Sequence, residues 1–217
     1  MSKQKDIFLE SEADAWTDRN LAALESRPIT EAHPVMEAMS GIVASGMLPD
    51  KPRVLEIGCG EGARLSWMAK HWQAQVSGID PSQKAVTLAR GKGVHAVRGT
   101  ADELPFADKH YDVVIFGFCL YLCDREDLST IAAEADRVLK PQAWIIIHDF
   151  FAIQEICCPY HHKAGVNTYK MDYRKLFENY PAYTCFFHKI LHHENQQFTD
   201  ASQDWVATSL LRKNAAA

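Results

Sequence analysis

Short apolar runs alternate with helical segments through the middle of the chain. Five runs of four to six residues are mostly apolar or β-branched, which predicts strands: Arg53–Ile57, Gln75–Ile79, Val94–Val97, Tyr111–Phe116 and Trp144–Ile147. Between them lie three segments whose apolar residues recur at helical spacing: 62–72, 83–90 and 128–139. Strands that alternate with helices indicate a parallel, doubly wound sheet. Because residues 113–116 and 144–147 are apolar throughout, we expect both faces of the sheet to be covered.

The flanking regions follow other patterns. Segments 8–26 and 31–46 favour helix and are separated at Pro28, since proline disfavours helix in the residue before it. Segment 151–181 is rich in aromatic residues and histidine and has no clean period. Two later segments, 183–192 and 204–212, favour strands that could form an antiparallel hairpin at the sheet edge.

These patterns together predict an α/β fold. We expect a doubly wound, mostly parallel, seven-stranded sheet with an N-terminal helical cap and a C-terminal antiparallel hairpin. The chain, 1–217, is interpreted as one domain in four parts: a cap at 1–48, a core at 49–150, an insert at 151–182 and C-terminal strands at 183–213.

Composition narrows the class of protein. The apolar fraction of 47% and charged fraction of 24% are ordinary for a globular protein. A net charge of −5, without Lys/Arg clusters beyond pairs such as Arg212-Lys213, argues against nucleic acid as a partner. No run approaches the roughly 20 apolar residues of a membrane span. Without an apolar leader we expect a cytoplasmic protein, whose six cysteines are reduced thiols.

Candidate chemistry gathers at the end of the first predicted strand. Gly58, Gly60 and Gly62 allow a tight turn and close approach of a ligand to bare backbone. Asp80 ends the second strand, where a carboxylate can accept both hydroxyls of a ribose. In open α/β sheets, ligands bind at this edge.

The glycine pattern alone leaves two cofactor classes open, because Gly58-x-Gly60-x-x-Ala63 also satisfies the dinucleotide fingerprint. Glu56 separates them. A carboxylate two residues before the turn repels a pyrophosphate but attracts a sulfonium or an ammonium. A Glu56 side chain that points away or pairs with a helix would not make this contact.

An ordered set of motifs resembles the class I S-adenosylmethionine-dependent methyltransferases. The segments are Val54–Gly62, Gly78–Ser82, Gly99–Phe106, Tyr111–Val114 and Arg137–Pro141. The set covers roughly residues 50–150 and is most similar to the small-molecule group that includes ubiquinone and menaquinone methyltransferases. The resemblance implies a Rossmann-like methyltransferase fold and S-adenosylmethionine as cofactor.

The resemblance also implies roles at matched positions. The backbone of Gly58, Cys59 and Gly60 would wrap the methionine part of the cofactor, with Glu56 near its ammonium. Asp80 would hold the ribose.

For the adenine and the sulfonium, the resemblance implies a second set of positions. Pro81 would lie beside the adenine, and the Ala101 backbone would read its edge. Family members often place Asp where this chain has Thr100, so either that hydroxyl or Asp102 would take the amino contact. Phe118 and Cys119, after the fourth strand, would pass near the sulfonium.

Acceptor-side residues are expected where the later strands end. His148 and Asp149 follow the fifth strand and are the candidate catalytic pair, one of them acting as base or orienting group. Four further residues are candidates for acceptor binding: Tyr121, Tyr160, His161 and Tyr169.

Three further features are a possible lid helix, a pair of adjacent histidines and a possible zinc site. Trp16 and Arg19 lie on a helix that could fold over the cofactor as a lid. His192 and His193 are expected on an edge strand, facing opposite ways. We expect no metal, because Cys157, Cys158, His161 and His162 lack the separated pairs of a usual zinc site.

We therefore predict transfer of a methyl group from S-adenosylmethionine to a small-molecule acceptor, through oxygen, nitrogen or carbon. Two alternatives stay open. A cofactor-binding module without catalysis would need only residues 54–121. A nicotinamide-dependent oxidoreductase is disfavoured by Glu56 and by Leu104-Pro105-Phe106, and no Tyr/Lys pair follows the sheet. The sequence does not indicate the acceptor or the oligomeric state.

Overall fold

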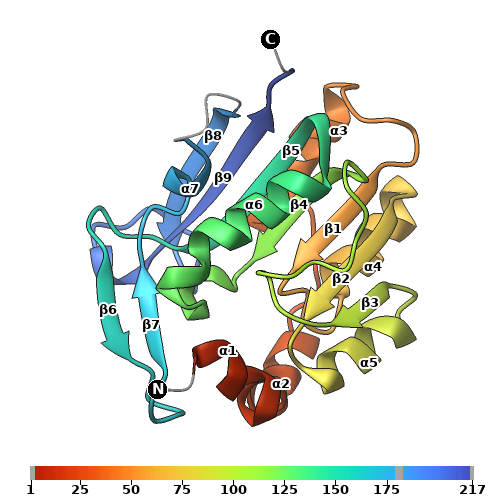
Figure 1. The fold of residues 1–217 in the computed structure, drawn as a ribbon. Coiled ribbons are helices and arrows are strands. Elements are labelled where there is room, and N and C mark those ends of the chain that lie inside the picture. The colour runs from red at the N-terminus through yellow and green to blue at the C-terminus, as the bar shows by residue number, and fades with distance from the viewer. Residues whose placement is uncertain (1–2, 179–182, 216–217) are drawn as a thin grey trace.

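Seven strands form the main sheet of the computed structural model, which describes residues 3–178 and 183–215 (Figure 1). In sheet order they are β3 (His95–Arg98), β2 (Gln75–Asp80), β1 (Arg53–Ile57), β4 (Tyr111–Gly117), β5 (Leu139–Phe150), β9 (Trp205–Lys213) and β8 (Tyr183–His192). The first five are parallel, whereas β9 runs antiparallel to both β5 and β8. This confirms the predicted sheet and its antiparallel C-terminal strands. Strand order reverses between β1 and β4, which is where such sheets bind ligands.

Helices cover both faces of the sheet, each through an apolar stripe. On one face, α3 (Pro34–Ala44), α4 (Ala63–Trp72) and α5 (Gln83–Gly91) pack against the sheet through Met39, Met68 and Val86. On the other face lie α6 (Leu128–Val138) and α7 (Lys175–Glu178), anchored by Ile131, Ala135 and Phe177. The inward residues of the central strands divide between these two cores, as expected for strands buried on both sides.

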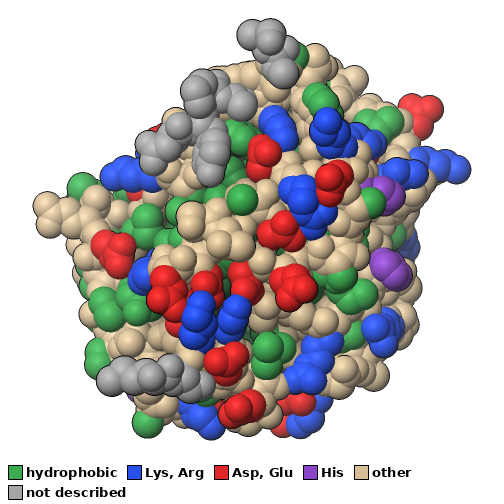
Figure 2. Space-filling view, viewed as in Figure 1, with side chains coloured by type: hydrophobic (Ala, Val, Ile, Leu, Met, Phe, Trp, Pro, Cys, Tyr) green, Lys and Arg blue, Asp and Glu red, His purple; other side chains and the backbone are tan. Residues whose placement is uncertain are grey.

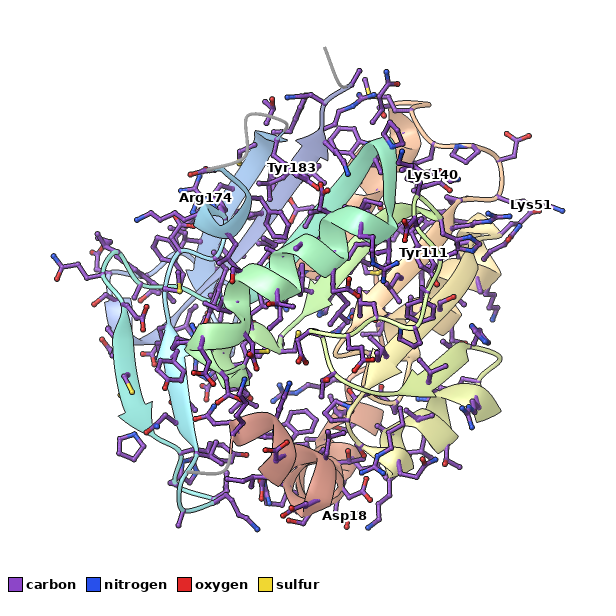
Figure 3. The ribbon with its side chains drawn as sticks, in the orientation of Figure 1. Asp18, Lys51, Tyr111, Lys140, Arg174 and Tyr183 are labelled. Atoms are coloured by element: carbon purple, nitrogen blue, oxygen red, sulfur yellow. The ribbon has the colours of Figure 1, made fainter. Side chains whose placement is uncertain are left out.

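The N-terminal segment forms a cap at the carboxyl ends of the parallel strands (Figure 1). It consists of α1 (Gln4–Ile7), a π-helical turn η1 (Phe8–Glu12) and α2 (Ala13–Glu25). In Figure 3, Asp18 on α2 marks this end of the molecule, and Tyr111 and Lys140 mark the opposite end of the strands. The cap therefore lies over the edge at which the glycine turn was predicted.

The region between β5 and β8, where the sequence has no clean period, contains a small hairpin that was not predicted. Strands β6 (Ile156–Pro159) and β7 (Asn167–Lys170) pair antiparallel in a separate two-stranded sheet. Every residue of β6 is exposed and every residue of β7 is half-buried. The sequence therefore carries no alternation of apolar and polar residues that would reveal these strands. Tyr160 and Val166 at the hairpin pack against Phe8 and Ala13 of the cap.

Three short 3-10 turns complete the described elements: η2 (Leu120–Leu122), η3 (Arg125–Asp127) and η4 (Ser202–Asp204). Figure 2 shows acidic and basic side chains interspersed over the face that carries α6. No helix within the described ranges is both long enough and apolar enough to cross a membrane.

Candidate active site

A cavity of about 680 Å³ lies at the carboxyl ends of β1, β2 and β4, beneath the cap. This volume is within the range of clefts that bind small molecules and cofactors. Its walls come from the turns after these strands and after β3, the cap, the linker before α3, the end of β5 and the turn after β8. The lining contains six carboxylates and three cationic side chains among the described residues, so its formal charge is negative.

The glycine turn after β1 brings bare backbone to the cavity. Gly58 has φ +73°, and a Cβ there would lie 2.6 Å from the Cβ of Cys119. Gly60 has φ +52°, and a Cβ there would meet nothing within 4 Å because it would project into open space. Both glycines and Cys59 line the cavity. Gly58 is thus required by packing and conformation, whereas Gly60 also leaves room for a ligand.

Asp80, at the end of β2, joins the glycine turn to the start of α5. Its Oδ2 accepts the N–H of Gly60 at 2.9 Å, and its Oδ1 accepts the N–H of Ser82 at 2.9 Å. Burial raises the pKa of this carboxyl to about 6, although the two amide donors oppose the shift. A carboxylate oxygen has two lone pairs, so each oxygen retains capacity for a ligand hydroxyl.

Glu56 pairs with a helix, which is one of the two arrangements that would weaken its use as a cofactor ligand. The carboxylate is fully buried, and its Oε1 accepts from Arg64 Nε at 2.6 Å and from Nη2 at 2.5 Å. Its Oε2 has no hydrogen-bond partner among the described residues. Arg64, on α4, lines the cavity, but Glu56 does not. Burial raises the pKa of Glu56, and Arg64 opposes that shift.

The residues predicted beside an adenine line one end of the cavity. Pro81, Thr100, Ala101 and Asp102 are all in its wall. The Asp102 carboxylate forms an ion pair with Lys5 of the cap, which lowers the pKa of Asp102 against the effect of its burial. This end of the cavity is therefore closed by a charged contact between the cap and the sheet.

Aromatic side chains surround the turn that follows β4. Phe118 adopts φ +66°, and its ring centroid lies 4.8 Å from Phe150, 5.4 Å from His148 and 5.5 Å from Tyr121. Phe118, Cys119 and Tyr121 line the cavity. Burial raises the pKa of the Cys119 thiol well above its usual value, so it is protonated at neutral pH and does not act as a nucleophile.

His148 lies in the cavity wall next to a second histidine. Its Nδ1 is 2.8 Å from Thr208 Oγ1 on the neighbouring strand β9, and its ring centroid is 5.5 Å from that of His33. Burial lowers the pKa of His148 well below its usual range. Burial, with a contribution from Arg64, lowers the pKa of His33 to about 3. Both imidazoles are uncharged at neutral pH.

Asp149 faces the other side of the sheet from His148, because adjacent residues of a strand alternate. Its Oδ2 accepts the N–H of Leu120 and its Oδ1 accepts the N–H of Phe150, both at 2.8 Å. Burial raises its pKa to about 7. Among the described residues, Asp149 is not part of the cavity wall, so the structure brings His148 to the cavity but leaves its neighbour behind the turn after β4.

The insert residues singled out from the sequence lie outside the cavity wall formed by the described residues. Tyr160 is buried against the cap, and its hydroxyl accepts from Arg19 Nη2 at 3.0 Å. His161 is exposed. The Arg125 guanidinium lies over the Tyr169 ring, with its Cζ 4.1 Å from the ring centroid. On the predicted lid, Trp16 lines the cavity, whereas Arg19 pairs with Glu12 and Tyr160.

His192 and His193 do not face opposite ways, so that expectation was wrong. Strand β8 ends at His192, His193 begins a turn, and the two rings stack with centroids 5.2 Å apart. With Asp204 they group three potential metal-ligand atoms within 4.8 Å. However, His192 Nδ1 accepts the N–H of Glu194, which places the proton of a neutral ring on Nε2, beside Asp204. A metal-bound histidine normally donates its other ring N–H, so this arrangement suits a turn better than a metal.

Sequence reasoning missed three residues of the site: His33, Arg64 and Thr208. His33 precedes Pro34 and caps α3, a position typical of a helix start, so the helix signal was present. Its place in the cavity depends on how α3 packs against β5 and β9, which no local pattern encodes.

A family comparison agrees with this geometry. Residues 55–147 match the methyltransferase domain family. Residues 55–147 therefore carry a methyltransferase domain. The match runs from β1 to the middle of β5, so the cap, the insert and the C-terminal strands lie outside it.

Curated relatives match the same part of the domain. A fatty-acid O-methyltransferase from Mycolicibacterium smegmatis is 33% identical over 102 residues, which are 45% of this chain and 36% of that protein. A demethylmenaquinone methyltransferase from Chlorobaculum parvum is 37% identical over 93 residues, 42% of this chain and 38% of that protein. The chain thus spans well under half the length of these two relatives.

Solved structures share the fold over more of the chain. A Burkholderia thailandensis 1,6-didemethyltoxoflavin N1-methyltransferase, bound to its substrate and S-adenosylhomocysteine, has a TM-score of 0.71 at 14% identity. The structural match covers 99% of this chain and 91% of the Burkholderia chain. An S-adenosylmethionine-dependent methyltransferase from Methanosarcina mazei has a TM-score of 0.64 at 16% identity. The match covers 80% of this chain and 98% of the Methanosarcina chain. At these identities the likeness establishes the methyltransferase fold.

Proposed function

We propose that this protein transfers a methyl group from S-adenosylmethionine to a small-molecule acceptor. The observation that carries the proposal is the glycine turn and Asp80 meeting in one cavity at the switch point of a methyltransferase domain. Gly60 leaves open space where a Cβ would stand, and the carboxylate beside it retains lone pairs for ribose hydroxyls. The excess of carboxylates in the lining suits a ligand with a sulfonium and an ammonium better than a pyrophosphate.

The residues around the cavity divide into cofactor and acceptor positions. Gly58, Cys59 and Gly60 would hold the methionine part of the cofactor. The ion pair with Glu56 would orient the Arg64 side chain beside them.

The adenine would lie against a separate group of wall residues. This group comprises Pro81, Thr100, Ala101 and Asp102. Phe118 and Cys119 would approach the methyl group, with Tyr121 and His148 facing the acceptor.

S-adenosylmethionine, when bound, supplies a methyl carbon already activated by a positive sulfur. The acceptor's electron pair forms the new bond to that carbon while the carbon–sulfur bond breaks, and the pair of that bond stays on sulfur. A proton on the acceptor atom is released. The protein's contribution is alignment of the two reactants in a site that the cap covers.

Ligand binding tests the cofactor. At one hundred times its dissociation constant, S-adenosylhomocysteine should stabilise the fold by about 2.7 kcal/mol. For a domain of this size we expect the melting temperature to rise by roughly 5–10 °C, with no rise for NAD. Stabilisation by NAD alone would refute the proposal in favour of the oxidoreductase.

Substitution of Asp80 tests the ribose position. Asp80→Asn should raise the dissociation constant of S-adenosylhomocysteine by about 10- to 100-fold, because charged hydrogen bonds contribute about 1.5–3 kcal/mol. Calorimetry measures the effect. The matched control is Asp18→Asn, an exposed carboxylate on the cap whose loss should leave the affinity unchanged. Equal affinity in both variants would reduce Asp80 to a structural cap.

Methyl transfer from labelled S-adenosylmethionine to the small-molecule fraction of a cell extract distinguishes an enzyme from a module that only binds. We expect label to leave the cofactor in the presence of the protein.

A further inference from the structure

Two imidazoles from distant parts of the chain meet at the acceptor end of the cavity. His33 caps α3, and His148 lies near the end of β5. Both line the cavity, and their ring centroids are 5.5 Å apart. Because both rings are neutral, each has one nitrogen that donates and one that accepts. The contacts of the Nδ1 atoms therefore decide what each Nε2 offers to a ligand.

The proton position in His33 follows from its capping role. Its Nδ1 accepts the backbone N–H of Val35 at 3.2 Å. A nitrogen that accepts a hydrogen bond carries no proton, so the proton of this neutral ring is on Nε2. His33 therefore offers an N–H donor at Nε2.

The proton position in His148 follows from Thr208. The Thr208 side chain is buried, and among the described residues its hydroxyl has His148 Nδ1 as its only hydrogen-bond partner. If Nδ1 donated to Oγ1, the hydroxyl hydrogen would be buried without an acceptor, at a cost of about 1–3 kcal/mol. If the hydroxyl donates to Nδ1, both atoms of this contact are satisfied, and the Nε2 N–H remains for a ligand in the cavity. The second arrangement places the His148 proton on Nε2.

We infer that His33 and His148 form a pair of neutral N–H donors that bind an oxygen atom of the methyl acceptor. This inference rests on the proposed function. The ring separation is one that two hydrogen bonds of about 2.9 Å to a shared oxygen can span. The ligand class is a flat compound with a carbonyl, enolate or phenolate oxygen at or beside the atom that is methylated.

The surroundings of the histidine pair support this class. The Phe118 ring packs 5.4 Å from His148 and supplies an apolar wall for a planar molecule. Two of the three cations in the described cavity wall, Lys5 and Arg64, already pair with carboxylates. The third, Arg27, lies on the exposed linker before α3. The site therefore does not select a carboxylate or a phosphate at the reacting end.

The inference assigns His148 to orientation of the acceptor rather than to proton removal, because an Nε2 that carries hydrogen cannot accept a proton. Two donors aimed at one oxygen favour its anionic form, so they lower the pKa of an enol, phenol or lactam. The acceptor loses its proton to water, its electron pair forms the bond to the methyl carbon, and the carbon–sulfur pair remains on sulfur.

Nitrogen NMR of the full protein labelled in histidine, with S-adenosylhomocysteine added, tests the tautomers. We expect both His33 and His148 to carry hydrogen on Nε2, with assignments from His33→Gln and His148→Gln. Thr208→Val removes the donor that holds the His148 proton on Nε2, so it should raise the fraction of His148 with hydrogen on Nδ1 and leave the tautomer of His33 unaltered. Hydrogen on Nδ1 of His148 in the wild-type protein would overturn the inference.

A matched pair of probes tests oxygen binding. We expect 2-quinolone to shift the Nε2 signals of both histidines, whereas naphthalene, a bicycle of the same size without a hydrogen-bond acceptor atom, should leave them in place. His148→Glu should weaken 2-quinolone binding by about tenfold or more, while His148→Gln, which keeps an N–H donor, should retain most of it. Equal shifts by both probes, or none by either, would overturn the assignment of an oxygen ligand.

The same samples separate this inference from the proposed function. Calorimetry that detects no S-adenosylhomocysteine binding would refute the methyltransferase proposal. Normal binding of S-adenosylhomocysteine with the opposite His148 tautomer would refute only the histidine pair.

Discussion

The cofactor half and the acceptor half of the cavity are built in different ways. The cofactor half uses turns that directly follow β1, β2 and β3, so its residues lie close together in sequence and within the family match. The acceptor half takes His33, His148 and Thr208 from three regions of the chain, and all three residues lie outside that match. A local motif can specify the first half, whereas the second exists only after the helices and strands have packed.

The largest effect should come from the buried ion pair beneath the cofactor half. Arg64→Met leaves the Glu56 carboxylate buried without its partner, which should cost about 3–5 kcal/mol of unfolding free energy near pH 7. Chemical denaturation measures the loss. The deficit should shrink toward pH 5, because burial already raises the pKa of Glu56 and favours its neutral form.

The double variant Glu56→Gln/Arg64→Met is the control for this prediction. It removes both charges and should recover most of the lost stability. If Arg64→Met alone is neutral, the cofactor half does not depend on this pair, and the contrast with the acceptor half weakens.

A smaller, pH-dependent effect should come from Asp149, which holds the turn between the two halves. Its pKa in the folded protein is raised from 3.8 to about 7, so folding favours the protonated form. The stability that this provides is fully present below pH 3.8 and is lost as the pH rises through about 7. Wild type should therefore lose more stability than Asp149→Asn between pH 5 and pH 8, by about 1–3 kcal/mol.

Urea unfolding of both proteins at these two pH values tests the prediction. Asp149→Asn also loses one acceptor for the amides of Leu120 and Phe150, so it should be less stable at pH 5, and its deficit should narrow at pH 8. A deficit that does not change with pH would contradict the raised pKa.

The smallest effect is expected in the insert. His161 is exposed and outside the described cavity wall, so His161→Ala should change the unfolding free energy by less than about 0.5 kcal/mol. Its affinity for S-adenosylhomocysteine, measured by calorimetry, should equal that of wild type. If 2-quinolone bound less well to this variant, the insert would belong to the acceptor half after all.

The sequence predicted the fold wherever burial leaves a pattern. The apolar runs of β4 and β5 and the turn at Gly58 were found because strands buried on both faces and positive φ angles restrict residue type. The hairpin β6–β7 was missed because its strands lack a buried face.

Within the site, sequence also favoured residues next to recognisable strand ends. Asp80 and His148 were identified in this way, and both line the cavity. The partner of Glu56 and the role of His33 could not be inferred, because Arg64 and His33 reach the cavity through helix packing rather than through a motif.

The place of β9 has a consequence for synthesis. It follows β8 in the chain yet lies between β5 and β8, so β8 has no neighbour in the main sheet until β9 has been made. Without β9, the ten residues of β8 would be an unpaired strand, and unpaired strand edges favour aggregation. Strand β9 also carries Thr208, the hydroxyl beside His148. The glycine turn can form before β9 is made, whereas the contact between Thr208 and His148 cannot.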